Sequence, residues 1–357
     1  MASNKSASSV STADIAIPGE LAPLDHGGDL GAARKLFPGA PEPFLDLSAG
    51  INPNPYPLPE LSDAIYARLP EQATLLELKE TAASAYGAPS PAHVAIAPGS
   101  QILVAQLGFL LVRGRAAVFA PTYAEHARVA ELAGHTVMEA ADVAQLADSR
   151  LAIVVNPNNP DGRIVAKDML LALADRLRRR GGLLLIDEAF MDVAAEGISV
   201  ADQVGRGNIV VLRSFGKFYG LPGVRLSFAL ATPEIASRLA AALGPWPVSS
   251  AAVAVGRAAL ADSPWGEKTR ASLAEAALRL DVLLAGAGLE VVGGTSLFRL
   301  ARTKEVATLF RHLGEAGIYV RRFSEYPAWL RFGLPGNEDE WQRLRSALMT
   351  FASAKTT

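Results

Sequence analysis

Lys217 is placed where its amine could attack a carbonyl carbon. The segment SFGKFYG at residues 214–220 puts this lysine between aromatic residues and glycines, just after the apolar run 209–212. Arg225 follows a few residues later. Partial burial and a neighbouring positive charge both lower the pKa of an amine towards its free base, which is the nucleophilic form. We therefore expect Lys217 to bond covalently to a carbonyl compound.

A carboxylate lies at the end of a second apolar run. Asp187 follows residues 183–186, which are all leucine or isoleucine, and it precedes Lys217 by 30 residues. That separation allows one crossover connection between neighbouring parallel strands. Pyridoxal 5'-phosphate (PLP) requires a lysine that forms its Schiff base and an acid that keeps its pyridine nitrogen protonated. The two residues therefore predict a PLP site at the ends of two strands.

Each of these residues alone also has an ordinary structural interpretation. Lysines are mostly exposed on protein surfaces. An aspartate at a strand end often caps a turn, and Arg225 could form a surface ion pair. The prediction therefore rests on the order and spacing of all the motifs together.

Composition excludes several classes of function. The chain has 357 residues, enough for two domains, and its 50% hydrophobic and 20% charged residues are typical of a soluble globular protein. A net charge of −2 gives no electrostatic case for binding nucleic acid or an anionic membrane. The absence of cysteine excludes disulfides and thiol catalysis. The five histidines have no metal-ligand spacing, so we expect no metal site.

The sequence also favours a cytoplasmic location. Residues 1 to about 18 are rich in serine and alanine and lack the apolar stretch of a signal peptide. The longest apolar runs, such as residues 105–112, are too short to cross a bilayer.

Short apolar runs alternate with helical patterns from about residue 92 to 243, which predicts an α/β fold with a mostly parallel sheet covered by helices on both faces. The strand candidates are 94–97, 116–120, 151–155, 183–186, 209–212 and 226–230. The helix candidates between them include 101–112, 123–133 and 167–180. In such a fold the ligand site lies where the strands give way to loops.

The chain divides into four segments. We expect a disordered tail (1–20), an N-terminal segment that packs with the small domain (21–59), a large PLP-binding domain (60–244) and a small α+β domain (245–357). The sequence Pro-Trp-Pro at 245–247 marks the boundary between the two domains. The small domain should contain a helix at 264–286, strands near 289–292, 297–301, 318–321 and 329–333, and a final helix from about 338. The proline-rich stretch 52–59 is predicted to be an ordered loop.

Two further loops could bind an anionic cofactor. Pro98-Gly99-Ser100-Gln101 follows a strand and opens a helix, where backbone N–H groups and a serine hydroxyl can hold phosphate. A simple helix cap at Ser100 is the alternative. The stretch NPNNPDG at 156–162 could donate an asparagine amide to a ring oxygen, or it could form only a tight turn.

Arginines in the C-terminal part suit an anionic substrate. Arg321 and Arg322 end one strand candidate, and Arg331 lies between apolar residues in the next. The guanidinium group binds carboxylates and phosphates through two parallel hydrogen bonds. Surface ion pairs are the alternative for each arginine, and Arg331 is the best candidate for a binding role.

These motifs, in this order, resemble the fold-type I PLP enzymes of the class I/II aminotransferase group, from about residue 24 to the C-terminus. Within the group, the chain is similar to the histidinol-phosphate aminotransferases and to the L-threonine-O-3-phosphate decarboxylases of cobalamin biosynthesis. The stretches HGGD at 26–29 and DLSAGINP at 46–53 resemble the decarboxylases. So does Phe190, because the aminotransferases usually have a tyrosine there.

The resemblance implies roles for individual residues. Lys217, Asp187 and Tyr123 would be catalytic, with Tyr123 stacked on the cofactor ring. The residues implied in cofactor binding are Gly99, Ser100, Gln101, Tyr123, Asn159, Asp187, Ser214, Lys217 and Arg225. For the substrate, Arg331 and Asn52 would bind the carboxylate, and His26 and Arg322 would reach the phosphate.

The resemblance also implies a homodimer with active sites at the subunit interface. Leu69 stands where the relatives have a tyrosine that reaches the neighbouring subunit, which puts that contact in doubt.

The implied reaction is PLP-dependent decarboxylation of L-threonine O-3-phosphate to (R)-1-amino-2-propanol phosphate. A histidinol-phosphate-type aminotransferase is the alternative, because both chemistries use the same catalytic residues. A PLP-binding regulator would need a DNA-binding module, and the first ~20 residues are too short for one. A catalytically silent scaffold remains a further alternative, although Lys217 and Asp187 are both present.

Overall fold

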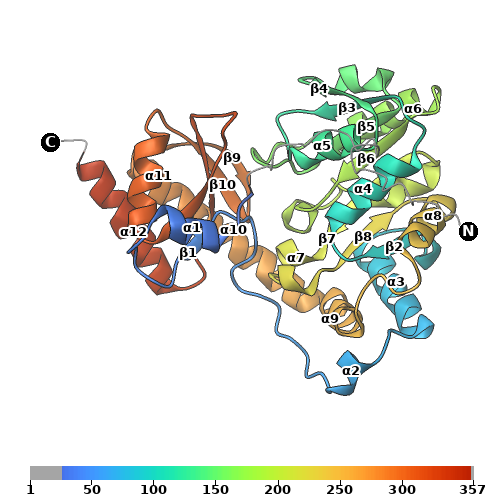
Figure 1. The fold of residues 1–357 in the computed structure, drawn as a ribbon, viewed down its shortest axis with the longest axis horizontal. Helices are drawn as coiled ribbons and strands as arrows, with labels where there is room; N and C mark the ends of the chain where they lie inside the picture. The colour runs from blue at the N-terminus through green and yellow to red at the C-terminus, as the bar shows by residue number, and fades with distance from the viewer. Residues whose placement is uncertain (1–25, 355–357) are drawn as a thin grey trace, which may run out of the picture.

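A computed structural model describes residues 26–354 of the chain, and the predicted tail lies outside them. The described residues form two sheets that lie side by side (Figure 1). The large sheet has seven strands in the order β2-β8-β7-β6-β5-β3-β4, and the small sheet has five in the order β1-β11-β12-β10-β9. Within this part of the chain, we find no helix with the length and apolar character needed to cross a membrane.

The large sheet is mostly parallel, as the sequence predicts. Its strands are β2 (Val94–Ala97), β3 (Arg115–Phe119), β4 (Thr136–Ala140), β5 (Leu151–Val155), β6 (Leu183–Asp187), β7 (Ile209–Ser214) and β8 (Ser227–Leu230). Among them, β8 runs opposite to the others, because it is antiparallel to both β2 and β7. Strand β4 was missed from the sequence. It is an edge strand and mostly solvent-accessible, so it lacks a continuous apolar run.

Helices cover both faces of the large sheet. They are α3 (Gln72–Tyr86), α4 (Ser100–Leu110), α5 (Glu125–Leu132), α6 (Lys167–Arg178), α8 (Pro233–Leu243) and α9 (Ser250–Ala261). Successive strand residues point to opposite faces. Ile153 lies in a core with α4, α5 and α8, whereas Val154 lies in a core with α3, α6 and α9. Apolar side chains are therefore needed at every position of the central strands, which explains the continuous apolar runs.

The small sheet combines an N-terminal strand with four C-terminal ones. Its elements are α1 (Leu30–Leu36), β1 (Leu45–Leu47), α10 (Ser263–Gly286), β9 (Glu290–Thr295), β10 (Phe298–Arg302), α11 (Val306–Glu315), β11 (Ile318–Arg322), β12 (Trp329–Gly333) and α12 (Glu338–Ser353). Strand β1 pairs in parallel with β11, so the N-terminal segment joins the small sheet. Helix α9 packs against α3, and the chain then passes to the small sheet along α10. The domain division at residue 245 stays a prediction.

The remaining elements are short. They are α2 (Ala64–Ala67), α7 (Phe215–Phe218) and 3-10 turns at Pro91–His93, Val143–Asp148, Met191–Val193, Ala201–Arg206 and Pro222–Val224.

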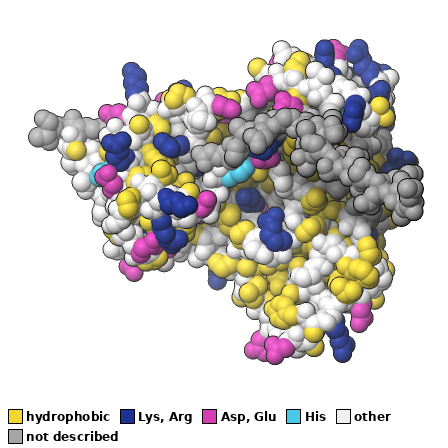
Figure 2. Space-filling view, viewed as in Figure 1, with side chains coloured by type: hydrophobic (Ala, Val, Ile, Leu, Met, Phe, Trp, Pro, Cys, Tyr) yellow, Lys and Arg dark blue, Asp and Glu magenta, His cyan; other side chains and the backbone are white. Residues whose placement is uncertain are grey.

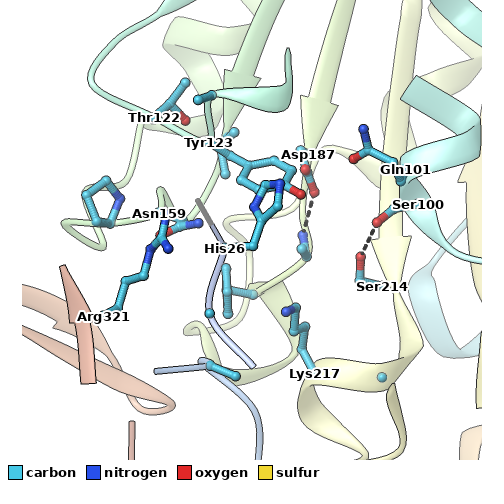
Figure 3. A pocket seen from close by; sticks show the side chains of 18 of the residues that line it. His26, Ser100, Gln101, Thr122, Tyr123, Asn159, Asp187, Ser214, Lys217 and Arg321 are labelled. Carbon is cyan, nitrogen blue, oxygen red and sulfur yellow. Dashed lines mark hydrogen bonds between the residues drawn. The ribbon is translucent and has the colours of Figure 1, made fainter. Parts of the chain in front are cut away.

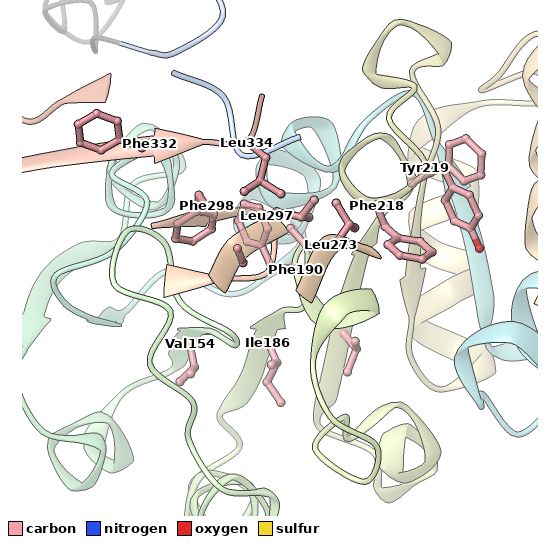
Figure 4. Close-up of a cluster of buried hydrophobic side chains, with 14 of the residues drawn as sticks. Val154, Ile186, Phe190, Phe218, Tyr219, Leu273, Leu297, Phe298, Phe332 and Leu334 are labelled. Carbon is pink, nitrogen blue, oxygen red and sulfur yellow. The ribbon is translucent and has the colours of Figure 1, made fainter. Parts of the chain in front are cut away.

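One hydrophobic core extends from the large sheet to the small one (Figure 4). Phe190, just after β6, packs edge-on against Phe298 of β10, with ring centroids 5.0 Å apart. Gly50 fits between them, because a Cβ there would lie 2.8 Å from the Phe298 ring. The position of the small sheet is therefore fixed by apolar contact directly beside the end of β6.

The proline-rich loop supports the helix that carries Lys217. Helix α7 has only four residues, so its terminal carbonyl groups need outside donors. The backbone N–H of Asn52 donates to Lys217 O at 2.9 Å, and its side-chain amide donates to Phe218 O at 2.9 Å. The N–H of Tyr56 donates to Tyr219 O at 2.9 Å. The loop therefore satisfies the terminal carbonyl groups of α7 and holds the helix that carries Lys217 in place.

A close backbone approach between the two sheets generates the first prediction. Gly162 has φ +72°, and a Cβ there would collide with the backbone of Gly294 in β9. We expect Gly162→Ala to lower the free energy of unfolding by about 2–3 kcal/mol in urea denaturation. Gly197→Ala is the control, since Gly197 has φ +78° but no atom lies within 4 Å of the point that its Cβ would occupy, and it should cost only about 1 kcal/mol. Equal losses would contradict a steric contact.

Candidate active site

A cavity of about 350 Å³ lies between the large and small sheets. It is lined by eleven of the residues that the sequence assigns to cofactor or substrate (Figure 3). They are His26, Gly99, Ser100, Gln101, Tyr123, Asn159, Asp187, Ser214, Lys217, Arg225 and Arg331.

The strand directions explain why these residues meet. Asp187 ends β6, Ser214 ends β7, and Gly99 lies two residues after β2. Parallel strands place their carboxyl ends at one edge of the sheet, where ligands bind. Arg225 precedes β8, and the reversed direction of β8 brings its beginning to the same edge, with Ser227 paired to Ser214.

Four residues form a cradle suited to a phosphate. Ser100 begins α4, and Ser214 Oγ donates to Ser100 Oγ at 3.0 Å (Figure 3). Arg225 has the left-handed conformation, with φ +55°, which is uncommon for a residue with a Cβ. Its guanidinium lies so close to Gly99 that any Cβ at position 99 would collide with it. The cradle therefore combines a helix N-terminus, two hydroxyls and one cation.

Asp187 is held by two hydrogen bonds. Its Oδ1 accepts from Ala189 N at 3.0 Å, and its Oδ2 lies 2.9 Å from Nε2 of His126. His126 is fully buried in the first turn of α5. Because an ionised carboxylate only accepts, Nε2 must carry the proton. His126 therefore orients the Asp187 carboxylate.

His126 was missed from the sequence, because it belongs to no metal-ligand pattern and to none of the motifs. A usable signal was its position three residues after Tyr123 at the start of a helix, since i and i+3 share a face. The ring of Tyr123 contacts His126 edge-on, with centroids 5.7 Å apart. Burial raises the pKa of the Tyr123 hydroxyl to about 12, with smaller contributions from Glu125 and Asp187, so the phenol stays neutral.

The amine of Lys217 has a lowered pKa, as the sequence predicts. Burial lowers it from 10.5 to about 8, and the charges of Arg331 and Arg225 act in the same direction. Asp187 opposes them by favouring the ammonium form. A substantial fraction of free amine is therefore available near pH 8.

Arg331 lies in β12 and is almost fully buried. One terminal nitrogen donates to Ser48 O at 2.7 Å, and the other donates to Oδ1 of Asn159. Burial and the neighbouring Arg321 lower the pKa of Arg331 to about 9, so it remains charged at neutral pH. Since arginine only donates, the Asn159 amide must turn its oxygen to Arg331, which leaves its NH2 group for another acceptor.

Two predicted substrate residues are not brought into the cavity. The Asn52 side chain is buried against α7, where it donates to Phe218 O instead of facing a ligand. Arg322 lies over the Phe310 ring, at 4.0 Å from the centroid, and is exposed. Successive strand residues point to opposite faces, so its neighbour Arg321 lines the cavity in its place. The alternation along β11 was the available signal.

His26 and Gln101 meet at the rim on one carboxylate. His26 Nε2 lies 3.0 Å from Oε1 of Glu125, and Gln101 Nε2 donates to Oε2 of Glu125 at 3.0 Å. Glu125 was not singled out in the sequence, where an acidic residue in the first turn of a helix is commonplace.

The chain is similar to proteins of one known family. The family model for aminotransferase class I and II matches residues 46–348. Threonine-phosphate decarboxylases from Sinorhizobium sp. and Pseudomonas aeruginosa are each 42% identical to this chain, over 92% of it and 98% of their own lengths. The solved histidinol-phosphate aminotransferase from Sinorhizobium meliloti, in complex with pyridoxal-5'-phosphate, has a TM-score of 0.79 at 20% identity. It covers 94% of this chain and 96% of its own, and at this identity it supports the fold alone.

The chain belongs to the class I and II aminotransferase family. The predicted family and the fold-type I α/β fold are therefore confirmed. PLP is the cofactor of this family, and the site fits it. The chain offers a phosphate cradle, an oriented carboxylate, an aromatic ring and a lysine with a lowered pKa.

The buried amine predicts how the stability of the cofactor-free protein depends on pH. Between pH 8 and 10.5 the unfolded chain holds the Lys217 proton and the folded chain does not, so stability rises with pH across this window. Below pH 8 the folded protein carries the full free-energy penalty of burying the charged Lys217 amine. We expect Lys217→Met to be more stable than the wild type by about 2 kcal/mol at pH 7, and the gap to close towards pH 10.5.

Urea unfolding of both cofactor-free proteins at pH 7 and pH 10 measures this difference. Lys268→Met is the control, since Lys268 is exposed and should give no such gain. A constant difference at both pH values would contradict a lowered pKa.

Proposed function

We propose that this chain is a PLP-dependent decarboxylase that converts L-threonine O-3-phosphate to (R)-1-amino-2-propanol phosphate, a reaction of cobalamin biosynthesis. The observation that carries the assignment is the 42% identity to two threonine-phosphate decarboxylases over 92% of the chain. The charge of the cavity agrees with it. Two arginines, Arg331 and Arg321, line the side that belongs to the small sheet, and the substrate carries a carboxylate and a phosphate.

The cofactor would be held by the residues that meet at the strand ends. We assign the cofactor phosphate to Gly99, Ser100, Ser214 and Arg225. Tyr123 would lie against the ring. Asn159 would donate its free NH2 group to the ring oxygen, a role that Phe190 cannot perform because it has no hydroxyl. Gln101 would act through the backbone at the start of α4, because its side chain is engaged by Glu125.

When bound, PLP supplies an electron sink for the pair left on Cα after a bond to it breaks. Asp187, fixed by His126, would hold a proton on the ring nitrogen. Arg331 would bind the substrate carboxylate and thereby orient Cα. Loss of CO2 leaves Cα one proton short, and Lys217 Nζ would supply that proton. The reaction thus consumes one proton and releases CO2 and the amine.

Arg321 takes the place that the sequence gave to Arg322. Arg321 lines the cavity close enough to Arg331 and Tyr123 to influence their pKa values, and His26 lies across from it. We assign the substrate phosphate to Arg321 and His26, and the substrate carboxylate to Arg331 alone.

We also propose a homodimer. The segment around α2 projects from the lower side of the large domain in Figure 1, and apolar side chains (yellow) gather on the lower part of that face in Figure 2. Leu58, Tyr66 and Leu69 are 61%, 71% and 61% exposed. Exposed apolar clusters favour burial against a partner. Leu69 lacks the hydroxyl of the tyrosine found in relatives, so another group would serve the neighbouring subunit. The cytoplasmic location also remains a prediction.

Variants of the two neighbouring arginines of β11 distinguish a substrate-binding residue from a surface residue. We expect Arg321→Gln to raise KM for threonine phosphate about 30-fold or more, since removing a charged contact typically costs about 2 kcal/mol. Arg322→Gln is the matched control and should leave KM within about twofold. Steady-state kinetics of both variants measure this. A larger rise in KM for Arg322→Gln than for Arg321→Gln would instead assign the substrate phosphate to Arg322.

The reaction itself is tested with threonine phosphate and no 2-oxo acid. We expect sustained CO2 release over many turnovers while the absorbance of the bound cofactor persists, because decarboxylation needs no amino acceptor. Lys217→Ala should release none. A single stoichiometric loss of cofactor absorbance without CO2, or turnover only with histidinol phosphate and 2-oxoglutarate, would identify an aminotransferase instead.

A further inference from the structure

Glu125 connects three segments at the rim of the cavity. It lies in the first turn of α5, and its carboxylate accepts from Gln101 of α4 at 3.0 Å and contacts His26 at 3.0 Å. Its side chain is only 13% exposed, against 45% for His26. The carboxylate is therefore the fixed member of the His26 contact.

Among residues 26–354, the other contacts of the segment that carries His26 involve Ser48 and Tyr123. The N–H of Gly28 donates to Ser48 Oγ at 2.7 Å, and Gly27 packs so closely against Ser48 O that a Cβ would collide with it. These contacts fix the backbone but not the imidazole. Its ring centroid lies 6.0 Å from that of Tyr123, beyond tight stacking (Figure 3). Holding an exposed side chain in one rotamer costs conformational entropy, and the Glu125 carboxylate offsets that cost.

The charges around His26 show what the contact achieves. The cavity presents the cations Lys217, Arg225, Arg321 and Arg331, and the acids Asp187, Glu125 and Glu325. A carboxylate at the rim of an anion-binding cavity would repel the ligand unless a cation neutralises it. Because a carboxylate only accepts, Nε2 of His26 must carry a proton, and the other ring nitrogen is left for the ligand. The contact therefore positions the His26 ring beside the anion-binding cavity.

We propose that Glu125 is a positioning residue that determines specificity for the phosphorylated substrate. It acts by holding His26 over the cavity with one ring nitrogen directed at the distal phosphate. The inference rests on the proposed function of the cavity and adds a residue that does not itself touch the substrate.

The first test compares Glu125→Gln with the wild type on threonine phosphate and on L-threonine. We expect KM for threonine phosphate to rise roughly tenfold, the usual effect of losing a charge-assisted hydrogen bond. The kcat value and the cofactor affinity should stay within about twofold, and kinetics on L-threonine should not change. Glu42→Gln is the matched control, because Glu42 pairs with Arg34 on the surface outside the cavity. Equal losses on both substrates would overturn the proposal.

A double-mutant cycle tests whether Glu125 acts through His26. If it does, His26→Ala and His26→Ala/Glu125→Gln should have the same KM for threonine phosphate, so the two effects should not add. Fully additive effects, or a cofactor affinity that falls in Glu125→Gln alone, would overturn the proposal and indicate that Glu125 acts through Gln101.

Side-chain NMR provides a readout that needs no turnover. In Glu125→Gln, the His26 imidazole should average over several rotamers, while hydrogen exchange of the amides of residues 26–29 and of α4 should not change, because Ser48 holds that backbone. An imidazole that keeps one rotamer in the variant would overturn the proposal. If the imidazole becomes mobile but threonine phosphate is not decarboxylated by the wild type, the proposed function fails and the specificity role fails with it, while the His26–Glu125 contact stands.

Discussion

The Lys217 amine and the Arg331 guanidinium share one buried space, and the carboxylate of Asp187 favours the charged form of the amine. Like charges at such distances repel, and burial removes the water that would otherwise screen them. Each cation must therefore be held by rigid surroundings, because a mobile side chain would turn towards solvent. Such an arrangement binds anions strongly, and the ligands proposed for it both carry phosphate.

The surroundings that hold these charges come from ordinary features of the fold. Parallel strands deliver Asp187 and the segment after Ser214 to one edge, and the reversed β8 delivers Arg225. His126 restrains Asp187 from the side of α5, and Asn159 restrains Arg331 from the loop after β5. Asp187 and Arg331 are thus each held by a hydrogen-bonding partner on another element. Such indirect supports commonly set the orientation and pKa of a reactive group.

The sequence predicts strand positions well where the apolar pattern is local. Several of the expected strands, including residues 94–97 and 151–155, begin and end at the residues observed, because their apolar runs are continuous and sharply bounded. The residues predicted to bind the cofactor line one cavity, because the loops that carry them meet at the ends of the strands. The direction of a side chain is not predicted from the sequence where it depends on tertiary contacts. Asn52 faces α7 rather than the ligand, and Arg322 points away from the face that Arg321 occupies.

The residues that the sequence did not reveal act through other residues. His126 and Glu125 have no pattern of their own, and their roles appear only when α5 is packed beside the ends of β6 and the start of α4. A histidine or glutamate in the first turn of a helix is common. His126 and Glu125 differ from other residues in the first turn of a helix only by their contacts with groups far along the chain.

The hydrogen bonds from the N-terminal segment to α7 and to Arg331 have a consequence for folding during synthesis. Asn52 bonds to a residue 166 positions later, and Ser48 accepts from Arg331, 283 positions later. During translation this segment is made before its partners, which lie 166 and 283 positions further along the chain. Contacts so distant in sequence form slowly, because a long loop must close first. The lysine site therefore depends on contacts that close long loops, and we expect it to become ordered late in folding.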